Sequence, residues 1–435
     1  MMSDKISIVW IRRDLRLDDN TALVHALNRG NRVLMLFIFD EDILKNLPKD
    51  DARVTFIHDT LNSMDRSLNE KGSSLLCIYG TPMSAWEKIT AEYEVVDVFA
   101  NKDYEPYAME RDNMIRTFLD EKGIPFHTFK DQVIFEENEV QKDDGKPYTV
   151  YTPYKNKWLK KFNRNTILIK QKAHFKNLYP CSFTMPTLHD IGFVRSGVKV
   201  PQFNLERVID YPHTREFPIE ITTLVGPHLR FGTISIRKLI AQLKIEDAVY
   251  LNELIWREFF MQILYHFPRV INNNFKQQYD FIKWRNNERE FDRWCNGTTG
   301  YPLVDAGMRQ LNNTGFMHNR VRMVVASFLC KHLLIDWRWG EAYFAAKLLD
   351  YDLSANNGNW QWAAGTGCDA APYFRVFNPS EQLKKFDKDL KYVRKWIPEF
   401  DDGNYPEPMV DHQFARKRAL DAYKKGLQEG SGYNS

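Results

Sequence analysis

The sequence predicts an α/β fold in its first third and an all-α fold in most of the remainder, and three observations carry this prediction. Short apolar runs recur at regular intervals up to about residue 130. Amphipathic helical patterns lie between these runs, as in a doubly wound parallel sheet. After Pro218 the pattern is helical almost throughout, and eight of the eleven tryptophans follow residue 250. The predicted fold class is therefore α/β, with an amino-terminal Rossmann-like domain followed by an all-α domain.

The expected strands and helices of the first third alternate along the chain. We expect strands at 7–11, 33–39, 75–79, 95–99 and 126–129. Helical patterns cover about 21–27, 53–71, 82–94 and 108–122. Thr81 before Pro82 fits a helix cap with a proline in the first turn, and Gly123 fits a helix stop.

The loop after the first strand carries charge rather than a phosphate-binding motif. Residues 14–20 read DLRLDDN, in which Asp19 or Asn20 can cap the next helix. No GxGxxG follows the first strand, and no GxxxxGK[ST] occurs anywhere in the chain. The usual loops that cradle nucleotide phosphates are therefore missing.

Periodicity fades between residues 131 and 201, which predicts a long connection over the surface. We therefore divide the chain into an α/β domain at 1–130, a connector at 131–200 and an α-helical domain at 201–430. Basic residues of the connector can touch a phosphate backbone, although a solvated face is the commoner use. The expected helices of the last domain cover 236–243, 248–265, 304–312, 318–334, 340–349 and 411–428.

Charge is distributed unevenly along the chain although the net charge is only +3. Residues 1–130 carry 17 basic and 22 acidic residues, and the remainder carries 43 basic and 35 acidic residues. A positive, aromatic-rich half fits a polyanion with stackable bases. It fits a solvated helical surface equally well.

The five cysteines are widely spaced and never form a CxxC motif, which argues against a disulfide framework or a structural zinc site. The start of the chain lacks the pattern of a signal peptide. No stretch approaches the roughly 20 apolar residues of a membrane span. We expect a cytoplasmic protein that binds no metal.

The segment from Asp350 to Pro379 concentrates unusual chemistry. On a helix, Trp360 and Trp362 would point roughly 200° apart, so the two rings can serve different partners. The amides of Asn356 and Asn357 offer donors and acceptors that suit a planar heterocycle. The alternative is a helix cap followed by core aromatics.

An acid, an indole and a guanidinium share one helical face at Glu253, Trp256 and Arg257. This set can bind and polarise a flipped base, or it can be an ion pair beside a core tryptophan. The hydroxyls and backbone N–H groups of residues 222–226 can seat a phosphate or only cap a helix.

A second polar group opens the helix expected at 318–334. Asn319 and Met323 lie on one face, whereas Arg320 and Arg322 leave at other angles and can serve two anions. We assign His318 no catalytic role, because a single histidine is more often a satisfied polar residue.

Together these residues resemble the photolyase/cryptochrome family of flavoproteins, and most closely the class I cyclobutane pyrimidine dimer photolyases. The segments that carry the resemblance are WREFF at 256–260, GYPLVDAGMRQL at 300–311, HNRVRM at 318–323 and DLSANNGNWQWAAGTGCDAAPYFRVFNP at 352–379. IRRDLRLDDNTAL and YEPYAMERD extend the likeness over nearly the whole chain.

The resemblance implies FAD, active as FADH⁻, bound in the all-α domain. It places Asp350 beside Arg322 at the flavin, Asp352 at the ring edge and the Asn356 amide at flavin N5, where an amide favours the fully reduced anion. The implied cofactor residues are Tyr211, Thr222, Thr223, Leu224, Val225, Gly226, Arg322, Asp350, Tyr351, Asp352 and Asn356. Since residues 224–226 lack hydroxyls, we expect their backbone N–H groups to contribute more of the phosphate binding.

The resemblance also implies light-driven repair of pyrimidine dimers in DNA by electron transfer to a flipped-out dimer, which is carbon–carbon lyase chemistry. The implied catalytic residues are Glu253, Trp256, Asn319, Asn356, Trp360, Trp337 and Trp284, of which the last three form an electron-hopping chain. The implied DNA contacts are Arg215, Glu253, Trp256, Arg257, Asn319, Arg320, Met323, Trp362, Arg375 and Gln382.

Two alternatives to dimer repair stay open at this point. One is a cryptochrome-like photoreceptor without repair activity, and such proteins commonly carry a long regulatory tail. The other is repair of (6-4) photoproducts, which needs pocket histidines, but Asn319 follows His318 where a second histidine would be needed.

The antenna implied for the amino-terminal domain is not identified by the sequence. Folate-binding relatives place Asn-Glu after the Tyr-acid pair, but here Tyr104 and Glu105 are followed by Pro106, Tyr107 and Ala108. A folate, a deazaflavin, a flavin mononucleotide or no second chromophore remains open. We expect a monomer that binds damaged DNA and needs no obligatory protein partner and no membrane.

Overall fold

The structure is a computed structural model that describes residues 5–168 and 173–431. Its contacts divide the chain into two compact units. The sheet unit comprises Met1–Glu139, Leu159–Pro201 and Val225–Ile245, and the helical unit comprises Val140–Trp158, Gln202–Leu224 and Glu246–Ser435. The expected connector is thus shared between the two units, and the three-part division of the chain stays a prediction.

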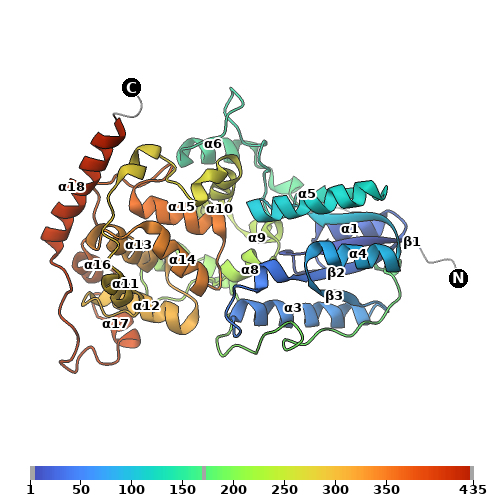
Figure 1. Ribbon diagram of the computed structural model, residues 1–435, viewed down its shortest axis with the longest axis horizontal. Coiled ribbons are helices and arrows are strands. Elements are labelled where there is room, and N and C mark those ends of the chain that lie inside the picture. Colours follow the sequence, from blue (N-terminus) through green and yellow to red (C-terminus); the bar gives the residue numbers. More distant parts are fainter. Residues whose placement is uncertain (1–4, 169–172, 432–435) are drawn as a thin grey trace. The chain divides into compact units, whose positions relative to one another are not determined.

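The sheet unit contains a five-stranded, fully parallel sheet with the order β3-β2-β1-β4-β5 (Figure 1). The register sets Val9 opposite Met35 on one side and Phe99 on the other. The strands are β1 (Lys5–Ile11), β2 (Arg32–Asp40), β3 (Leu75–Gly80), β4 (Glu94–Asn101) and β5 (Phe126–Phe129). The predicted doubly wound sheet and all five of its strands are confirmed.

Alternate residues of each strand supply two separate cores, because side chains of a strand point to opposite faces. Val9 and Ile11 pack in one core with residues of α1 and α3, whereas Ile8 and Trp10 pack in the other with residues of α4 and α5. Both faces are therefore buried, as expected for a parallel sheet. The helices of this unit are α1 (Thr21–Asn28), α2 (Glu41–Leu44), α3 (Ala52–Asn69), α4 (Pro82–Glu92), α5 (Pro106–Glu121), α8 (Gly226–Arg230) and α9 (Ile236–Gln242).

The predicted helix ends in this unit are confirmed. The Asn20 side chain accepts a hydrogen bond from the Leu23 backbone N–H at 3.1 Å and so caps α1. Thr81 caps α4, with Pro82 in the first turn. Gly123, with φ of +70°, follows the end of α5.

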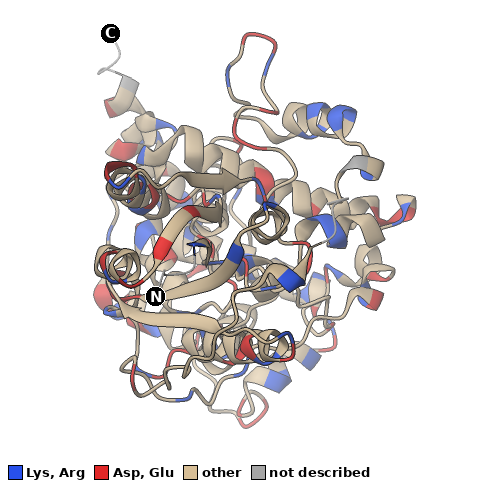
Figure 2. Ribbon diagram, turned by 90° about the vertical axis from the view of Figure 1, so that its right-hand side faces the viewer, with Lys and Arg blue, Asp and Glu red and all other residues tan. Residues whose placement is uncertain are grey.

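Internal ion pairs occupy the loops beyond the carboxyl ends of β1 and β4, where the strand order reverses and open α/β sheets bind nucleotides. Arg12 contacts Asp112 at 2.5 Å, and Arg13 contacts Glu105 at 2.8 Å. Burial would raise the pKa of Asp131, but the guanidiniums of Arg16 and Arg237 outweigh burial and lower it. Figure 2 shows basic and acidic residues interspersed in this way over the side of the molecule that carries the N terminus.

The named elements of the helical unit are all helices or helical turns. Its α-helices are α6 (Tyr151–Lys161, whose last residues belong to the sheet unit), α7 (Tyr211–Thr214), α10 (Ala248–His266), α11 (Glu288–Cys295), α12 (Pro302–Thr314), α13 (Asn319–Ser327), α14 (Trp337–Lys347), α15 (Leu353–Ala364), α16 (Pro379–Phe386), α17 (Lys391–Trp396) and α18 (His412–Ser431). The helical unit also contains the 3-10 turns η3 (Leu205–Val208), η5 (Pro268–Ile271) and η6 (Gln277–Phe281) and the π-helical turn η7 (Phe328–His332). The 3-10 turns η1 (Arg164–Thr166) and η2 (Phe175–Asn177) belong to the sheet unit, and η4 (Ile245–Asp247) begins at the last residue of that unit. None of the helices within the described residues is long and apolar enough to cross a membrane.

The connection expected over the surface at 131–201 contains a helix that the sequence did not predict, α6. Tyr151, Tyr154 and Trp158 line one side of this helix and are buried. The Trp158 indole N–H donates to the Glu258 carboxylate of α10 at 2.7 Å. Tertiary packing thus supports a helix whose polar composition gave little local signal.

The helix expected at 318–334 is also corrected, because α13 ends at Ser327 and a π-helical turn follows it. The turn buries Lys331, whose ammonium donates to the Ala364 carbonyl at 2.7 Å, at the carboxyl end of α15. Burial lowers the pKa of Lys331 to about 7. A cation at this helix end is favoured by the helix dipole.

Two glycines let neighbouring helices approach α15 closely. A Cβ placed on Gly340 of α14 would lie 2.1 Å from the Trp360 ring, and one placed on Gly358 of α15 would lie 2.1 Å from the Phe260 ring. Neither distance is possible for a real side chain, because an aromatic ring already fills the space beside each glycine.

We predict that Gly340→Ala destabilises the protein by about 2–3 kcal/mol, because the added methyl group overpacks against the Trp360 indole. Urea denaturation followed by tryptophan fluorescence measures this loss. Gly197→Ala is the matched control, since nothing lies within 4 Å of a Cβ there. Equal stability of Gly340→Ala and wild type would show that Trp360 does not occupy this position.

Candidate functional site

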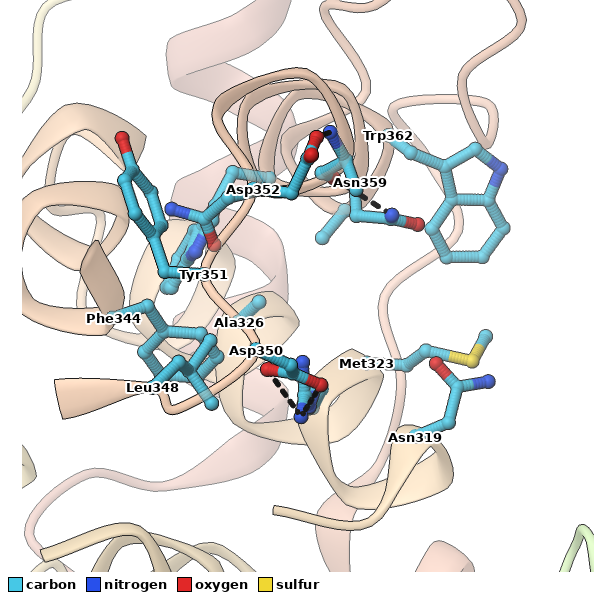
Figure 3. A pocket seen from close by; sticks show the side chains of 15 residues that line it. Asn319, Met323, Ala326, Phe344, Leu348, Asp350, Tyr351, Asp352, Asn359 and Trp362 are labelled. Carbon is cyan, nitrogen blue, oxygen red and sulfur yellow. Dashed lines mark hydrogen bonds and ion pairs between the residues drawn. The ribbon is translucent and has the colours of Figure 1, made fainter. Parts of the chain in front are cut away.

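One pocket of the helical unit gathers many of the residues that the resemblance assigned to the cofactor and the lesion. The lining comes from α13, α14, α15 and the turn at 348–352 (Figure 3). The predicted site residues that line it are Asn319, Arg322, Met323, Asp350, Tyr351, Asp352, Asn356, Trp360 and Trp362. Ala326, Phe344, Leu348, Ala355, Asn359 and Ala363, which the sequence analysis did not single out, complete the lining.

The start of α15 is set by Asp352 and not by the asparagines. The Asp352 carboxylate accepts a hydrogen bond from the Ala355 backbone N–H at 3.2 Å and caps the helix. Asn356 and Asn357 therefore lie inside the helix, and the alternative in which they cap it is wrong. Their poor intrinsic helix propensity is offset by buried hydrogen bonds.

Hydrogen bonds of Asn357 and Gln361 join α15 to the backbone of residues 268–275. The Asn357 amide donates to the Val270 carbonyl at 2.9 Å, and the Gln361 amide donates to the same oxygen at 3.0 Å. Gln361 in turn accepts from the Phe275 backbone N–H at 2.8 Å. With one face of α15 held by these bonds, the opposite face is turned to the pocket.

Asn356 is oriented by a carboxylate that the sequence analysis missed. Its Nδ2 donates to the Glu341 side chain at 2.8 Å and to the Glu341 carbonyl at 3.0 Å. Within the described residues no donor reaches its Oδ1, so this oxygen is available to an N–H group of a ligand. Burial raises the pKa of Glu341, although the bond from Asn356 opposes this shift.

An ion pair lies across the floor of the pocket. Arg322 contacts Asp350 at 2.9 and 3.1 Å, and its Nε also donates to the Met317 carbonyl at 2.8 Å. The pairing implied by the resemblance is thus present in the structure. Figure 3 shows Asp350 between the side of the pocket formed by Tyr351, Phe344 and Leu348 and the side formed by Met323 and Asn319.

The two tryptophans of α15 have different surroundings, as their spacing predicted. Trp360 is buried and contacts Phe344 and Trp294, with ring centroids 5.0 and 6.1 Å away. Trp362 is half-buried and, in Figure 3, lies with Met323 and Asn319 at one side of the pocket.

Not every residue assigned to the lesion lines this pocket. Trp256 is stacked on Tyr151 of α6 at a centroid distance of 3.5 Å, and it also stacks on Phe260 at 5.5 Å. The sequence analysis did not single out Tyr151, because its segment was read as a surface connection. The tyrosines of the stretch YTVYTPY at 148–154 are spaced three residues apart, and this spacing could have indicated a helix with one aromatic face.

Glu253 forms an ion pair with Arg215 at 2.8 Å. Both side chains are partly exposed, at 29% and 24%. Arg257 is half-buried on the same helix as Glu253. The carboxylate assigned to the lesion is therefore held by an arginine assigned to the DNA strand.

The remaining residues assigned to DNA lie on α13, on α16 and in the segment before α16. Arg320 forms an ion pair with Glu216 and lies 4.5 Å from the Phe386 ring centroid. Arg375 is exposed. Gln382 is half-buried, and its Oε1 has no partner within the described part of the chain.

The residues assigned to ribose and phosphates are placed by α7 and by the loop before α8. Tyr211 begins α7 and contacts Tyr250 edge to face at 5.0 Å. Thr223 is buried and its hydroxyl is already bonded to the Tyr250 hydroxyl at 2.9 Å. Leu224 has a φ of +54°, a backbone conformation more usual for glycine. Thr222 belongs to the same loop, Val225 is the N-cap of α8 and Gly226 is its first residue.

The indoles assigned to electron hopping have separate environments. The Trp337 indole N–H donates to Asn274 at 2.9 Å, and the ring is completely buried. Trp284 is partly buried and contacts Tyr423 edge to face at 5.8 Å. Trp294, which was not assigned, is a buried indole in contact with Trp360.

Tyr107 and Glu105, in the segment where this chain departs from the folate-binding pattern, each have partners within the sheet unit. The Tyr107 hydroxyl donates to Asp40 at 2.7 Å. Glu105 accepts from Arg13 at 2.8 Å and from Arg230 at 2.7 Å. The identity of any second chromophore stays a prediction.

His318 caps α13 and stays neutral. Its Nδ1 accepts from the Arg320 backbone N–H at 3.2 Å. Burial, together with the positive charges of Arg322, Arg320 and Arg215, lowers the pKa of His318 to about 4. The Nε2 atom has no partner within the described residues.

The pocket as a whole fits a flavin. The free Asn356 oxygen can accept from a ring N–H, the Arg322–Asp350 pair and Asp352 supply charge at a ring edge, and Trp360 and Phe344 supply apolar surface. A planar heterocycle with donors and acceptors along its rim needs this combination.

Comparisons with known proteins agree with this interpretation. Residues 7–174 match the family model described as DNA photolyase, and residues 250–403 match the model described as the FAD binding domain of DNA photolyase. A deoxyribodipyrimidine photo-lyase from Alkalihalophilus pseudofirmus is 35% identical, with 98% of this chain and 99% of the relative covered.

Solved structures show the same likeness. A class III photolyase from Agrobacterium tumefaciens superposes with a TM-score of 0.88 at 33% identity, covering 98% of this chain and 99% of that chain. The archaeal photolyase from Sulfolobus tokodaii, solved with two FAD molecules, superposes with a TM-score of 0.83 at 33% identity, covering 97% and 100%.

We predict that the neutral state of His318 makes stability depend on pH. Its folded pKa of about 4 lies below its ordinary value of 6.5, so the unfolded chain binds a proton that the folded chain does not. The free energy of unfolding should therefore fall by about 2–3 kcal/mol from this residue as the pH drops from 6.5 towards 4. Urea denaturation across this range measures the loss.

His318→Asn separates this residue from other acid-sensitive groups, because asparagine also caps helices. The variant should lose clearly less stability than wild type between pH 6.5 and 4. His213→Asn, at an exposed position, is the control and should keep the wild-type pH dependence. Identical pH profiles for all three proteins would contradict a buried neutral His318.

Proposed function

The chain belongs to the DNA photolyase family, and from this premise we propose that it is a deoxyribodipyrimidine photo-lyase that uses blue light to split cyclobutane pyrimidine dimers in DNA. The substrate is a dimer turned out of the duplex into the pocket of the helical unit. Extrusion is less costly for a damaged base than for a paired one, which favours lesions over normal sites.

One observation carries this proposal above the others. The amide of Asn356 and the side chains of Asn319, Met323 and Trp362 line the same pocket, although they come from two helices about thirty residues apart. A single cavity can therefore hold a flavin ring beside a base. A photoreceptor without repair activity has no need for this second set of residues.

When bound, reduced FAD would supply the electron that breaks the dimer. The residues of the chain orient it and exclude water. Glu341 holds the Asn356 amide so that Oδ1 can accept a hydrogen bond, and the Arg322–Asp350 pair supplies a fixed charge distribution beside it. Charges fixed before the reaction need no reorganisation during it.

The lesion would be held by groups around the other side of the pocket. Asn319 can bond to a base edge, while Trp362 and Met323 offer apolar surface for stacking. We assign Glu253 the role of bonding to the lesion once Arg215 has turned to a DNA phosphate. Trp256 would stack on the lesion side opposite its partner Tyr151.

The cellular setting belongs to the same proposal. We infer a monomer that acts in the cytoplasm without an obligatory protein partner. All five cysteines have free thiols, as expected in a reducing compartment. A second chromophore in the sheet unit would act as an antenna, and the absorbance spectrum of the purified holoprotein would identify it.

A repair assay tests the proposed function. Reduced holoprotein is mixed with an oligonucleotide that carries one thymine dimer and is illuminated with blue light. Intact thymines should reappear with time in the light and not in the dark. Their return is measured as the recovery of the thymine absorbance band at roughly 260 nm. Bound FAD without any turnover would refute repair and favour a photoreceptor.

We predict that Trp284→Phe slows the light-driven reduction of oxidised flavin by at least about tenfold, because phenylalanine is much harder to oxidise than tryptophan. Repair by enzyme that was reduced chemically beforehand should stay close to wild type, since that step does not use the indole chain. Flavin absorbance under illumination measures the first rate, and the dimer assay measures the second.

Trp396→Phe provides the control, because this partly buried tryptophan is not assigned to the chain of indoles. An equal loss of photoreduction and repair in Trp284→Phe would exclude the electron-hopping role of Trp284.

A further inference from the structure

Two of the arginines assigned to DNA, Arg215 and Arg320, share one carboxylate in the free protein. Glu216 follows α7 and forms an ion pair with Arg320 of α13 through Oε2. Its other oxygen, Oε1, lies 3.7 Å from Nε of Arg215. A single acidic side chain therefore contacts both guanidiniums.

Other neighbours also hold the two arginines in place. Arg320 lies over an aromatic ring, and Arg215 has both an aromatic ring and a second acidic partner. Arg320 lies over the Phe386 ring at 4.5 Å, and Arg215 lies over the Tyr211 ring at 5.3 Å. Arg215 also contacts Glu253 at 2.8 Å. These contacts can keep the guanidiniums in position if Glu216 leaves.

The cluster retains buried donor capacity that the chain itself does not use. Nε of Arg320 and Nε2 of His318 are buried without a partner within the described residues. Nδ1 of His318 accepts a hydrogen bond, so the proton of the neutral ring is on Nε2. Both atoms are therefore N–H donors, which an anion and not a cation would satisfy.

We propose that Glu216 is a resident phosphate mimic, which occupies Arg215 and Arg320 in the free protein and is displaced when the phosphates of the DNA strand bind them. A carboxylate and a phosphate accept hydrogen bonds from a guanidinium with the same forked geometry. The Glu216 side chain is 35% exposed, so it can turn into water without leaving a buried charge behind.

This inference rests on the proposed function, because it takes the arginines to be phosphate contacts. It adds a residue that sets the strength of DNA binding. Each arginine–phosphate contact is made at the cost of a contact to Glu216, so the acid weakens binding to any DNA. Release of Arg215 towards phosphate also frees Glu253, which links strand binding to the availability of the lesion-facing carboxylate.

A purely structural role for Glu216 leads to the opposite expectation. If the acid is needed to position the two guanidiniums, its removal should loosen them and weaken DNA binding. If it competes with phosphate, its removal should strengthen binding. The sign of the change in affinity thus decides between the two roles.

The test compares Glu216→Gln with Glu220→Gln in the flavin-loaded protein. Both variants lose one negative charge, but Glu220 is exposed and lies four residues further along the chain. Dissociation constants are measured by fluorescence anisotropy on an undamaged duplex and on a duplex with one thymine dimer, over a series of KCl concentrations. Glu216→Ala is the second variant, and thermal melting shows that each protein is folded.

We expect Glu216→Gln and Glu216→Ala to bind both duplexes about three- to tenfold more tightly than Glu220→Gln, the gain appropriate to one or two partly exposed ion pairs. The slope of the logarithm of the binding constant against the logarithm of the KCl concentration should also be steeper in the Glu216 variants, by up to about one unit. In the wild type, the carboxylate displaced by DNA takes up a cation, and the variants have no such carboxylate. Adding Arg320→Gln to Glu216→Gln should remove most of the gain.

Equal or weaker binding of Glu216→Gln relative to Glu220→Gln on the undamaged duplex would overturn the inference. Equal affinity of the wild-type protein for the undamaged duplex and the duplex with a thymine dimer would instead count against the proposed function. The two failures are distinguishable, because the comparison of variants on undamaged DNA does not depend on recognition of the dimer or on light.

Discussion

The candidate site depends on a pair of buried amides that fix the rotation of α15. Asn357 and Gln361 both donate to the Val270 carbonyl, and Gln361 also accepts from the Phe275 backbone N–H. Leaving these groups unpaired in the core would be costly, so the helix cannot turn about its axis without losing them. Asn356 and Trp362 are consequently directed to the pocket, and the approach of α14 at Gly340 completes the constraint around Trp360.

Charge is used differently in the two units. In the sheet unit, arginines and acids pair with one another near the carboxyl ends of the strands, as in the contacts of Arg16, which follows β1, and Arg237 with Asp131, which follows β5. These partners are buried, and breaking such pairs would be strongly unfavourable. In the helical unit, the ion pairs of Arg215 and Arg320 are partly exposed. Partly exposed pairs contribute little to stability and are therefore the ones that a polyanion can replace.

Most of the fold followed from local pattern. The alternation of apolar runs predicted all five strands, and the caps at Asn20 and Thr81 followed from ordinary helix-end chemistry. The failures have a common cause. Helix α6 is polar and aromatic, and it is stabilised by the bond from Trp158 to Glu258 of a distant helix, which no local window contains. The asparagines of α15 looked like a cap because their partners lie outside the helix, Glu341 of α14 for Asn356 and the distant Val270 for Asn357.

For the site, the sequence by itself determined which residue types are present and that Trp360 and Trp362 must point in different directions, because helical spacing alone sets that angle. Its motifs also singled out Arg322, Asp350 and Asn356. Only the tertiary structure decided which groups hold them. Glu341 orients the Asn356 amide, Tyr151 stacks on Trp256, and Glu216 contacts two of the arginines assigned to DNA. These partners come from separate helices and turns, and their contacts arise from packing between elements, which spacing along the chain does not encode.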